Sequence, residues 1–275
     1  MEPVPIMING LPGNMAGIMF NAAMKDRRVT PVPFSLTGPD ISFSDVQTET
    51  VTVRLLHPDS REEDIRDILE RYPGLIMVDY THPSGVNENA RFYVRHGVPF
   101  VMGTTGGDRA MLEETVRQSE ISAVISPNMA KQIVGFQAMM AFGASSFPDL
   151  FKGYSLQVKE SHQRGKADTS GTAKAIVDSF RRMGISCSEK DIQMERDPER
   201  QRDVWGVPEA FLKGHGWHTY TLTSEDRTVT FEFKHNVNGR DVYTLGTLDA
   251  VLYLHDKVQN GDRGRVFTMM DVLKG

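Results

Sequence analysis

The chain has 275 residues, of which 39% are hydrophobic and 24% are charged, and its formal net charge at pH 7 is -5. This length suits one large domain or two smaller ones with a buried core, and the composition is globular rather than disordered. The negative charge argues against a nucleic-acid partner, and the single cysteine, Cys187, excludes an internal disulfide and a cysteine-based zinc site.

Strands and helices are predicted to alternate through the first half of the chain. Short continuous apolar runs predict buried strands, and apolar residues spaced by three or four predict helices. The expected strands span 4–9, 29–36, 51–56, 75–80, 99–102 and 122–126, and the expected helices span 15–23, 60–72, 87–96 and 108–119. Ser60 and Glu63 are expected to form a capping box, and Asp108 to cap the helix after it. This alternation is typical of a parallel sheet covered on both faces.

The second half of the chain follows a different pattern. Apolar and polar residues alternate over 154–160 and 229–234, which predicts strands with one buried face, and helices are expected at 131–147, 173–183 and 249–257. We therefore predict an α/β protein with a Rossmann-like dinucleotide-binding domain and a second α+β domain on a mostly antiparallel sheet. The expected division assigns 1–129 and 241–275 to dinucleotide binding, and 130–240 to substrate binding and oligomerisation.

No apolar run reaches the length of a membrane span, and the N-terminus has no charged-then-apolar signal region. The lone cysteine also favours a reducing compartment. We therefore expect a soluble protein without a membrane partner, and any transit peptide would lie outside the given chain.

A glycine turn follows the first predicted strand. Gly10 and Gly13 precede the small pair Ala16-Gly17 at the start of the first helix. Small residues let the backbone approach a pyrophosphate, whose charge sits on the free N–H groups of the helix. The usual first spacing is G-x-G rather than G-x-x-G, so a tight strand-to-helix turn without a ligand is the alternative.

The end of the second predicted strand bears on the choice of cofactor. An acidic residue that binds the adenosine ribose is expected about 20 residues after the turn, but no Asp or Glu occurs there before Asp40. Ser35 and Thr37 instead offer hydroxyl donors for a 2′-phosphate. This pattern favours NADP over NAD.

Three further strand ends carry polar or small residues that packing does not require. They are 79–83, with Asp79 and Thr81, then the Gly-Thr-Thr-Gly turn at 103–106, and 126–129. Ligands of open α/β sheets bind at the carboxyl ends of the strands, so these segments are candidates to contact a ligand, and the Gly-Thr-Thr-Gly turn is suited to a position beside a nicotinamide ring. Ordinary loop chemistry with helix caps is the alternative for each segment alone.

The segment 160–175 combines a titratable side chain with an anion-binding turn. The strand ending near Glu160 delivers His162, and Lys166 follows in the loop. The next helix begins at 170–172, a Ser-Gly-Thr turn whose free N–H groups and hydroxyls suit a carboxylate or phosphate. His162 is the natural proton donor near neutral pH. The alternative is an exposed polar loop before a capped helix.

Two other features are not assigned to the chemistry. His215 and His218 lie three residues apart, but no third ligand or clear helix accompanies them, so a structural or interface role is expected and no metal is predicted. Cys187 has no neighbouring base in the sequence and is not expected to be a catalytic thiol.

These motifs together resemble dihydrodipicolinate reductase. His162-x-x-x-Lys166 followed by Asp168-x-Ser-Gly-Thr-Ala resembles the signature of this family, and the resemblance runs nearly end to end. The segments 193–198, 206–209, 235–240 and 271–273 are similar to the plant-type branch in particular. Gln163 stands where bacterial members often have a second histidine.

The resemblance implies a role for each matching position. The catalytic pair would be His162, as the acid, and Lys166. The cofactor would be NADPH, with NADH possible, and it would contact Gly10, Gly13, Asn14, Met15, Ser35, Thr81, Gly103, Thr105, Pro127 and Asn128. The substrate would contact Lys166, Ser170, Gly171, Thr172 and Arg240.

The resemblance also implies a reaction and an assembly. The reaction would be the NADPH-dependent reduction of 4-hydroxy-tetrahydrodipicolinate, a cyclic dicarboxylate, to tetrahydrodipicolinate in the diaminopimelate route of lysine biosynthesis. The two domains would close on this substrate. A homodimer or homotetramer is expected, in a plastid stroma if the source is a plant or alga and otherwise in a bacterial cytoplasm. The alternatives are another two-domain amino-acid dehydrogenase, acting on aspartate or diaminopimelate, and a nucleotide-binding sensor without catalysis.

Overall fold

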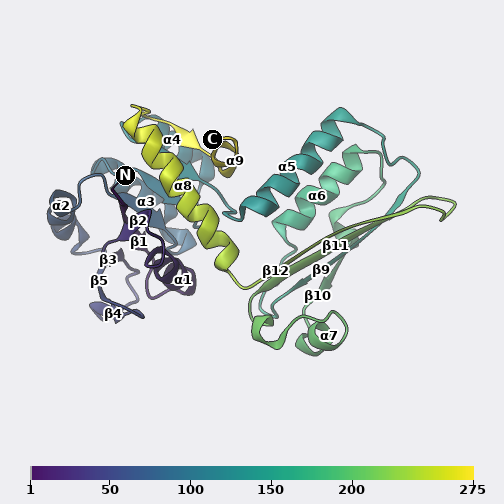
Figure 1. The fold of residues 1–275 in the computed structure, drawn as a ribbon, viewed down its shortest axis with the longest axis horizontal. Coiled ribbons are helices and arrows are strands. Elements are labelled where there is room, and N and C mark those ends of the chain that lie inside the picture. Colours follow the sequence, from purple (N-terminus) through teal and green to yellow (C-terminus); the bar gives the residue numbers. More distant parts are fainter. Residues whose placement is uncertain (1) are drawn as a thin grey trace. The chain divides into compact units, whose positions relative to one another are not determined.

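The computed structural model describes residues 2–275 and divides the chain into two compact units (Figure 1). Among these residues, the first unit comprises 2–131 and 241–275, and the second comprises 132–240. No helix in the described part of the chain is long and apolar enough to cross a membrane.

The first unit is built on a parallel sheet of six strands in the order β13-β8-β7-β6-β1-β2. All five pairings between neighbours are parallel. The strands of this sheet are β1 (Val4–Asn9), β2 (Val29–Pro31), β6 (Ile76–Asp79), β7 (Phe100–Met102), β8 (Ala123–Ile125) and β13 (Val266–Phe267). Because the central strands are buried on both faces, they consist of continuous apolar runs.

Helices cover both faces of this sheet. The helices of the first unit are α1 (Asn14–Ala23), α2 (Arg61–Arg71), α3 (Val86–Arg95), α4 (Arg109–Arg117), α8 (Asp241–Gln259) and α9 (Met269–Lys274), with a 3₁₀ turn η1 (Pro83–Gly85). Apolar residues of α2, α3 and α4 share one core with Met7 and Met77 of the sheet. Helices α1 and α8 contact each other, and α8 also contacts β6, β7 and β8. The expected parallel sheet with helices on both faces is confirmed.

The second expected strand, 29–36, is divided in two. Its halves are β2 and β3 (Phe34–Leu36), which pair with different partners, because β3 joins a small sheet with β5 (Thr52–Leu56) and β4 (Asp45–Gln47). Pro31 and Pro33 lie at the break, and neither has an N–H group to continue a ladder. The prediction of one continuous strand was wrong for this reason.

Two further predictions in the first unit have different outcomes. Asp108 caps α4, since its carboxylate accepts from the N–H of Met111 at 3.0 Å, as expected. Ser60 precedes α2, but its side chain makes no capping hydrogen bond. The N–H of Glu63 instead donates to the carbonyl oxygen of Ser60 at 3.1 Å, so the expected capping box is absent.

The second unit contains a four-stranded sheet in the order β10-β9-β11-β12. Its elements are α5 (Lys131–Ser146, of which Lys131 belongs to the first unit), β9 (Ser155–His162), α6 (Gly171–Arg182), η2 (Glu189–Asp191), β10 (Ile192–Glu195), α7 (Pro198–Asp203), η3 (Glu209–Phe211), β11 (His215–Thr223) and β12 (Thr230–Asn238). Two pairings are antiparallel and β10 pairs with β9 in parallel, so the sheet is mixed.

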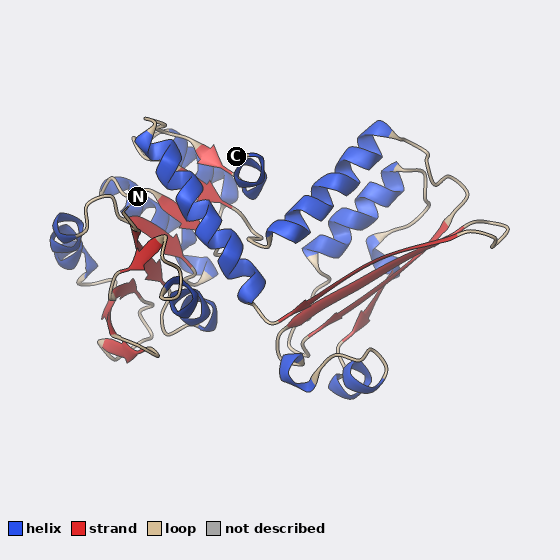
Figure 2. Cartoon of the chain, viewed as in Figure 1, coloured by secondary structure: helices blue, strands red, loops and turns tan. Residues whose placement is uncertain are grey.

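Helices α5 and α6 lie along one face of this sheet (Figure 2). Their apolar residues, including Ala144 and Phe180, form a core with Val158 of β9 and Tyr220 of β11. Strands β9 and β12 correspond to the alternating patterns at 154–160 and 229–234, whereas no pattern predicted β10 or β11. The last long helix begins at Asp241, eight residues before the predicted start at 249.

Candidate active site

The turn between β1 and α1 is shaped by two glycines. Gly10 has a φ of 112°, and its N–H donates to the carbonyl oxygen of Leu36 at 2.9 Å. A Cβ atom at Gly10 would lie 2.3 Å from the carbonyl oxygen of Tyr80, and one at Gly13 would lie 2.7 Å from that of Gly10. Neither position accepts a side chain without moving backbone, so both glycines are required by close packing.

Helix α1 starts immediately after this turn. Asn14 is exposed and Met15 half-buried, and the first turn contains no acidic residue. The first helical hydrogen bond runs from the N–H of Gly17 to the carbonyl oxygen of Gly13 at 3.0 Å, so the N–H groups of 14–16 have no partner within the helix. This helix start is therefore suited to the phosphates of a dinucleotide.

Ser35 and Thr37 stabilise the glycine turn through hydrogen bonds to the backbone of Leu11. The Ser35 hydroxyl accepts from the N–H of Leu11 at 3.2 Å, and the Thr37 hydroxyl donates to the carbonyl oxygen of Leu11 at 2.8 Å. Ser35 is 0% exposed and Thr37 is 8% exposed. Both hydroxyls are predicted to bind a cofactor phosphate. In the structure both are used within the turn and Ser35 is enclosed, so their contact with a cofactor stays a prediction.

Asp79 links the carboxyl ends of β6 and β7 through hydrogen bonds to Thr81 and Thr104. It is 0% exposed, and one carboxylate oxygen accepts from the hydroxyls of Thr81 at 2.8 Å and Thr104 at 2.6 Å. The other oxygen accepts from the hydroxyl of Tyr93 at 2.6 Å and the amide of Asn89 at 3.1 Å. Burial and the charge of Asp79 raise the pKa of Tyr93 well above its ordinary value, which keeps the phenol a donor. The Thr81 side chain is thus used to hold the strand end.

The remaining cofactor candidates lie at the same sheet edge. A Cβ atom at Gly103 would lie 2.5 Å from the ring of Tyr80, so this position must be glycine. Thr105 and Pro127 are exposed and Asn128 is half-buried. They follow β7 and β8, which are parallel to β1, and their strand ends therefore share one edge with the glycine turn. Contact of these residues with a cofactor stays a prediction.

In the second unit, the loop between β9 and α6 carries the predicted chemistry. His162 is the last residue of β9, and Lys166 follows in the loop, where its ammonium group donates to Asp168 at 2.8 Å. The N–H of Ser170 donates to the carboxylate of Glu160 at 3.1 Å, which fixes the start of α6 against β9. Glu160 and His162 are two residues apart and so project from the same face of the strand.

The start of α6 has free donors. Gly171 is exposed and Thr172 is half-buried, and the first helical hydrogen bond runs from the N–H of Lys174 to the carbonyl oxygen of Ser170 at 3.1 Å. The N–H groups of 171–173 therefore have no partner within the helix. In the part of the chain that the structure describes, the hydroxyls of Ser170 and Thr172 make no hydrogen bond.

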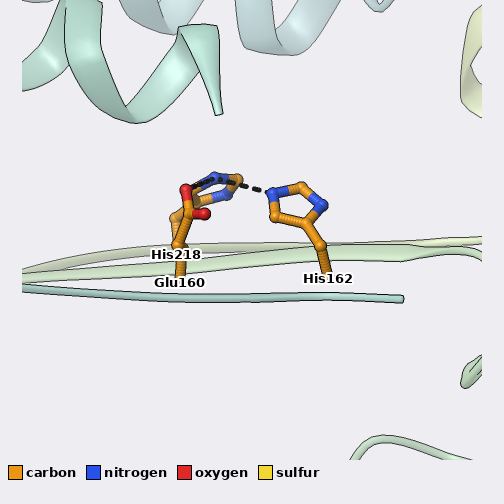
Figure 3. Close-up of side chains that lie close together, drawn as sticks. All are labelled: Glu160, His162 and His218. Carbon is orange, nitrogen blue, oxygen red and sulfur yellow. Dashed lines mark hydrogen bonds and ion pairs between the residues drawn. The ribbon is translucent and has the colours of Figure 1, made fainter. Parts of the chain in front are cut away.

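The His162 ring lies over the backbone of Gly216, its partner across β9 and β11. A Cβ atom at Gly216 would lie 3.0 Å from the ring. Nδ1 of His162 is 3.1 Å from the carbonyl oxygen of His215, and Nε2 is 3.3 Å from Nε2 of His218 (Figure 3). Because a carbonyl only accepts, Nδ1 of His162 carries a hydrogen, and Nε2 of the neutral ring is an acceptor.

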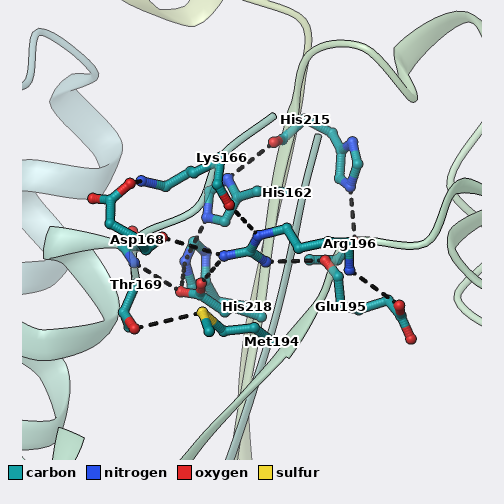
Figure 4. A network of polar contacts seen from close by, with 12 residues as sticks. His162, Lys166, Asp168, Thr169, Met194, Glu195, Arg196, His215 and His218 are labelled. Carbon is teal, nitrogen blue, oxygen red and sulfur yellow. Dashed lines mark hydrogen bonds and ion pairs between the residues drawn. The ribbon is translucent and has the colours of Figure 1, made fainter. Parts of the chain in front are cut away.

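Arg196, just after β10, joins the carboxylate to the loop (Figure 4). Its guanidinium donates to Glu160 at 2.5 Å and to the carbonyl oxygens of Lys166 at 2.7 Å and Asp168 at 3.3 Å. Glu160 is 0% exposed. Burial alone would raise the pKa of Glu160, but its interactions with His218, Arg196 and the backbone of Ser170 outweigh burial and lower the pKa to about 2.

The ring of His162 is uncharged at neutral pH in the structure as it stands. Burial lowers its pKa to about 4, and the nearby His218, Arg196 and Lys166 act in the same direction. Glu160 opposes this shift without overcoming it. For His162 to act as a proton donor, additional negative charge must therefore arrive nearby.

Glu160, His162 and His218 also have the residue types of a metal site, with ligand atoms all within 4.8 Å of one another. The carboxylate, however, already accepts from the guanidinium of Arg196. A metal cation there would face this fixed positive charge as well as Lys166. We therefore interpret the cluster as a hydrogen-bonded set of side chains.

Arg240 is the last residue of the second unit and follows Gly239, which has a φ of 75°. The Arg240 side chain is half-buried and makes no hydrogen bond or ion pair within residues 2–275. Its expected contact with a substrate stays a prediction.

Sequence reasoning missed three residues that surround His162. Glu160 was used only as the end of a strand, His218 was set aside, and Arg196 was noted only within a family resemblance. The spacing of Glu160 and His162 was a usable signal, because residues two apart on a strand share a face. The part played by His218 depends on the register of β9 and β11, which no local pattern shows.

Comparison with known proteins gives matches over nearly the whole chain. The family model for the N-terminus of dihydrodipicolinate reductase matches residues 4–129, and the model for its C-terminus matches residues 133–273. The protein named 4-hydroxy-tetrahydrodipicolinate reductase 2, chloroplastic, of Arabidopsis thaliana is 47% identical over 271 residues, which cover 98% of this chain and 77% of that protein. A probable chloroplastic reductase of the same name from Oryza sativa subsp. japonica is 44% identical, covering 98% and 83%.

A solved structure has the same fold. Dipicolinate-bound dihydrodipicolinate reductase from Paenisporosarcina sp. TG-14 aligns with a TM-score of 0.66 over 97% of each chain. Its sequence identity to this chain is 15%, so this likeness concerns the fold alone.

Proposed function

This chain belongs to the dihydrodipicolinate reductase family, and we propose that it reduces 4-hydroxy-tetrahydrodipicolinate to tetrahydrodipicolinate with NADPH, in lysine biosynthesis through diaminopimelate. The observation that carries the proposal is the arrangement around the β9–α6 loop. There, an uncharged His162, the ammonium group of Lys166 and the free start of α6 belong to one short segment.

The dicarboxylate substrate supplies the negative charge that this segment lacks. One carboxylate would accept from the free N–H groups of 171–173 and from the hydroxyls of Ser170 and Thr172. The ammonium group of Lys166 would pair with the substrate, either in place of Asp168 or together with it. Breaking the ion pair with Asp168 costs little free energy, because the Asp168 side chain is exposed to solvent. The substrate charge raises the pKa of His162 and makes it a competent acid.

A nicotinamide cofactor bound in the first unit would supply a hydride for carbon C4 of the substrate ring, and the 4-hydroxyl group would leave as water. This reaction consumes one proton per turnover, and we assign its delivery to His162. Lys166 and the helix start stabilise the negative charge that builds on the ring as the hydride arrives. They also hold the ring in one orientation.

The glycine turn and the free start of α1 support a dinucleotide in the first unit. NADPH is proposed over NADH because no acidic residue occurs at 34–39, where an acid would bind the ribose 2′-hydroxyl and repel a 2′-phosphate. A ratio of kcat/KM for NADPH over NADH above one supports this choice, and a ratio below one contradicts it.

The deciding experiment follows NADPH oxidation by the purified protein, with substrate generated from pyruvate and aspartate semialdehyde by the preceding synthase. Wild type is expected to oxidise NADPH rapidly, and His162→Ala and Lys166→Ala to lose roughly 100-fold or more in rate, the usual range for a positioned acid. Gln163→Ala, at the neighbouring loop position, is the matched control. NADPH binding by wild type without any oxidation would refute the reductase proposal.

We further propose that the protein forms a homodimer or homotetramer through the second unit. Helix α5 leaves Met139 65% and Phe142 68% exposed, and large exposed apolar side chains mark interaction surfaces. Light scattering of wild type is expected to show the oligomer, and Phe142→Ser to shift it toward the monomer. Met111→Ser, at an exposed apolar position of α4, should leave the mass unchanged. A wild-type monomer at micromolar concentration would contradict the proposal.

The chloroplastic relatives support a plastid stroma as the compartment if the source is a plant or alga, and a bacterial cytoplasm remains the alternative for a bacterial source. Fractionation of source cells with an antibody against the protein distinguishes these compartments.

A further inference from the structure

Three titratable side chains form one row across the second sheet. The strand register places Glu160 of β9 opposite His218 of β11, and His218 opposite His235 of β12. His162 belongs to the next pair along β9 on the same face, and its Nε2 atom approaches Nε2 of His218 at 3.3 Å (Figure 3). The ring of His218 is almost fully enclosed, with 3% of the residue exposed.

The contacts of the two imidazole rings decide which nitrogen donates the hydrogen between them. Nδ1 of His162 donates to the carbonyl oxygen of His215, so Nε2 of the neutral ring has a free electron pair. The neighbouring Nε2 of His218 must then carry the hydrogen that lies between them. The same atom lies 3.7 Å from the carboxylate of Glu160. Nδ1 of His218 is buried and has no partner among the described residues.

We propose, on the basis of the function proposed above, that His218 is a positioning residue for His162 and that the two rings share the proton delivered to the substrate. His218 holds the His162 ring in the tautomer with hydrogen on Nδ1. Together with Gly216, which leaves room for the ring, it also fixes where Nε2 of His162 lies.

The proton balance of the proposal is simple. Before the dicarboxylate binds, we assign the pair two hydrogens, one on Nδ1 of His162 and one on Nε2 of His218. When the dicarboxylate binds, the pair takes up one proton from solvent at Nδ1 of His218. His162 then gives the substrate the proton that the two Nε2 atoms share, and transfer of the remaining His218 hydrogen from Nδ1 to Nε2 through solvent restores the first arrangement. Glu160 stays ionised throughout and offsets the positive charge on the pair.

The charges around His162 and His218 explain why the two rings take up a proton only when the substrate binds. The carboxylate of Glu160 is already paired with Arg196, so the protein provides little net negative charge to the two rings. The lowered pKa of His162 agrees with this geometry. Other groups facing His218 are Tyr220, whose pKa is raised by burial, and His235, whose pKa is lowered to about 4 by burial and by His218. Both stay uncharged at neutral pH, which leaves the substrate as the source of negative charge.

His235 provides a matched control. Its ring centroid lies 4.5 Å from that of His218 on the adjacent strand, and the residue is half-buried with both ring nitrogens enclosed. It makes no hydrogen bond, and no contact joins it to His162 within residues 2–275. A general disturbance of this buried row would therefore affect His235→Gln and His218→Gln alike.

The first test uses the free protein and needs no turnover. Nitrogen-15 NMR of the histidine side chains is expected to show hydrogen on Nδ1 of His162 and on Nε2 of His218 at pH 7. The opposite tautomer of His162 would overturn the proposal. In His218→Leu, the His162 resonances are expected to shift to a mixture of tautomers, whereas His235→Gln should leave them in place.

The second test measures proton uptake on binding of pyridine-2,6-dicarboxylate, the ligand named for the related Paenisporosarcina reductase, in the presence of NADP⁺. Calorimetry in buffers of different ionisation enthalpy is expected to give uptake of about one proton per site for wild type and His235→Gln. Uptake should fall well below one in His162→Gln and in His218→Leu. Uptake of one proton per site in His218→Leu would show that His162 takes up the proton alone, and it would overturn the proposal that the two rings share it.

The third test separates positioning from packing in turnover. His218→Leu is expected to lower kcat by roughly 10- to 100-fold, below the full contribution of an acid, while KM for the substrate changes less than threefold. His218→Gln should recover part of the loss, because its amide can donate to Nε2 of His162. Unchanged kcat and an unchanged pH profile in both variants would overturn the proposal. If His218→Leu does not fold, as circular dichroism would show, His218→Gln still tests the sharing in the calorimetric experiment, because its amide cannot take up a proton.

The outcomes distinguish this inference from the proposed function. Failure of wild type to oxidise NADPH refutes the function, while the NMR test still decides the pairing of the rings. Activity that is lost with EDTA and restored by Zn²⁺ would show that Glu160, His162 and His218 hold a metal instead, and would overturn the shared proton.

Discussion

Gly10 and Gly17 lie in one segment but differ in the space around them. An added Cβ atom at Gly10 would meet the carbonyl oxygen of Tyr80 at 2.3 Å, and the φ of 112° disfavours any L-residue, whereas Gly17 has nothing within 4 Å. We expect Gly10→Ala to destabilise the first unit by about 2–4 kcal/mol and to weaken NADPH binding at least tenfold. Gly17→Ala, on the helix, should be neutral or stabilise by about 0.5 kcal/mol.

Denaturation followed by circular dichroism and titration with NADPH would measure these two effects. Equal NADPH affinity in wild type and Gly10→Ala would show that the turn tolerates a side chain, and that close packing does not explain the glycine.

Single residues near His162 also act through the backbone. Gly216 leaves room for the ring, and the carbonyl oxygen of His215 selects its tautomer. The side chain of His215 is occupied elsewhere, with Ser161 and with the backbone of Phe211. A structural or interface role was expected for His215 and His218, and their contributions to this site come from a carbonyl group in one case and a ring nitrogen in the other.

At the scale of secondary-structure elements, Arg196 ties β9, β10 and the β9–α6 loop together. Its planar guanidinium contacts Glu160 and the carbonyl oxygens of Lys166 and Asp168 at once. Arg196→Lys keeps the charge but cannot make all three contacts, because an ammonium group has no fixed fork of donors. We expect KM for the dicarboxylate to rise roughly tenfold through disorder of the loop, with a smaller effect on kcat.

Arg200→Lys is the matched control for this prediction. Arg200 pairs with Glu195 at 2.8 Å, but its side chain is 62% exposed, so the pair contributes little. Equal KM values for both variants and wild type would show that the loop keeps its conformation without Arg196.

At the scale of the whole molecule, the two units should respond differently to acid. Burial lowers the pKa of His162 and of His235 to about 4, and both residues belong to the second unit. An unfolded histidine titrates near 6.5, so between pH 6.5 and 4 the unfolded chain binds more protons than the folded chain. Stability of the second unit should therefore fall as pH falls through this window. Glu160, with a folded pKa of about 2, adds a further loss only below about pH 4.5.

The chain offers a convenient probe of this unit. Its two tryptophans, Trp205 and Trp217, both lie in the second unit, so tryptophan fluorescence reports on that unit alone. The thermal midpoint seen by fluorescence should drop between pH 7 and pH 5, and His235→Gln should reduce the drop. A midpoint that does not change over this range in wild type would show that the two histidines titrate normally.

Much of the architecture follows from local patterns. The alternation of apolar strands with helices predicted the parallel sheet covered on both faces, and the structure confirms it. The capping by Asp108 and the helix start at 170–172 were also predictable, because residues within a few positions determine them. The segment with His162 and Lys166 was found for the same reason.

Only the tertiary structure decided what surrounds that segment. His218 is 56 residues from His162 in sequence, and Arg196 is 36 residues from Glu160. Their contacts depend on the register of β11 against β9 and of β10 against β9, and shifting a strand by one residue would turn each side chain to the other face. Similarly, Ser35 was predicted to face a ligand, yet the packing of the glycine turn encloses it. The sequence by itself determined most elements of the first unit and the chemistry available, whereas the pairing of distant strands decided which groups meet, because that register is a property of the whole sheet.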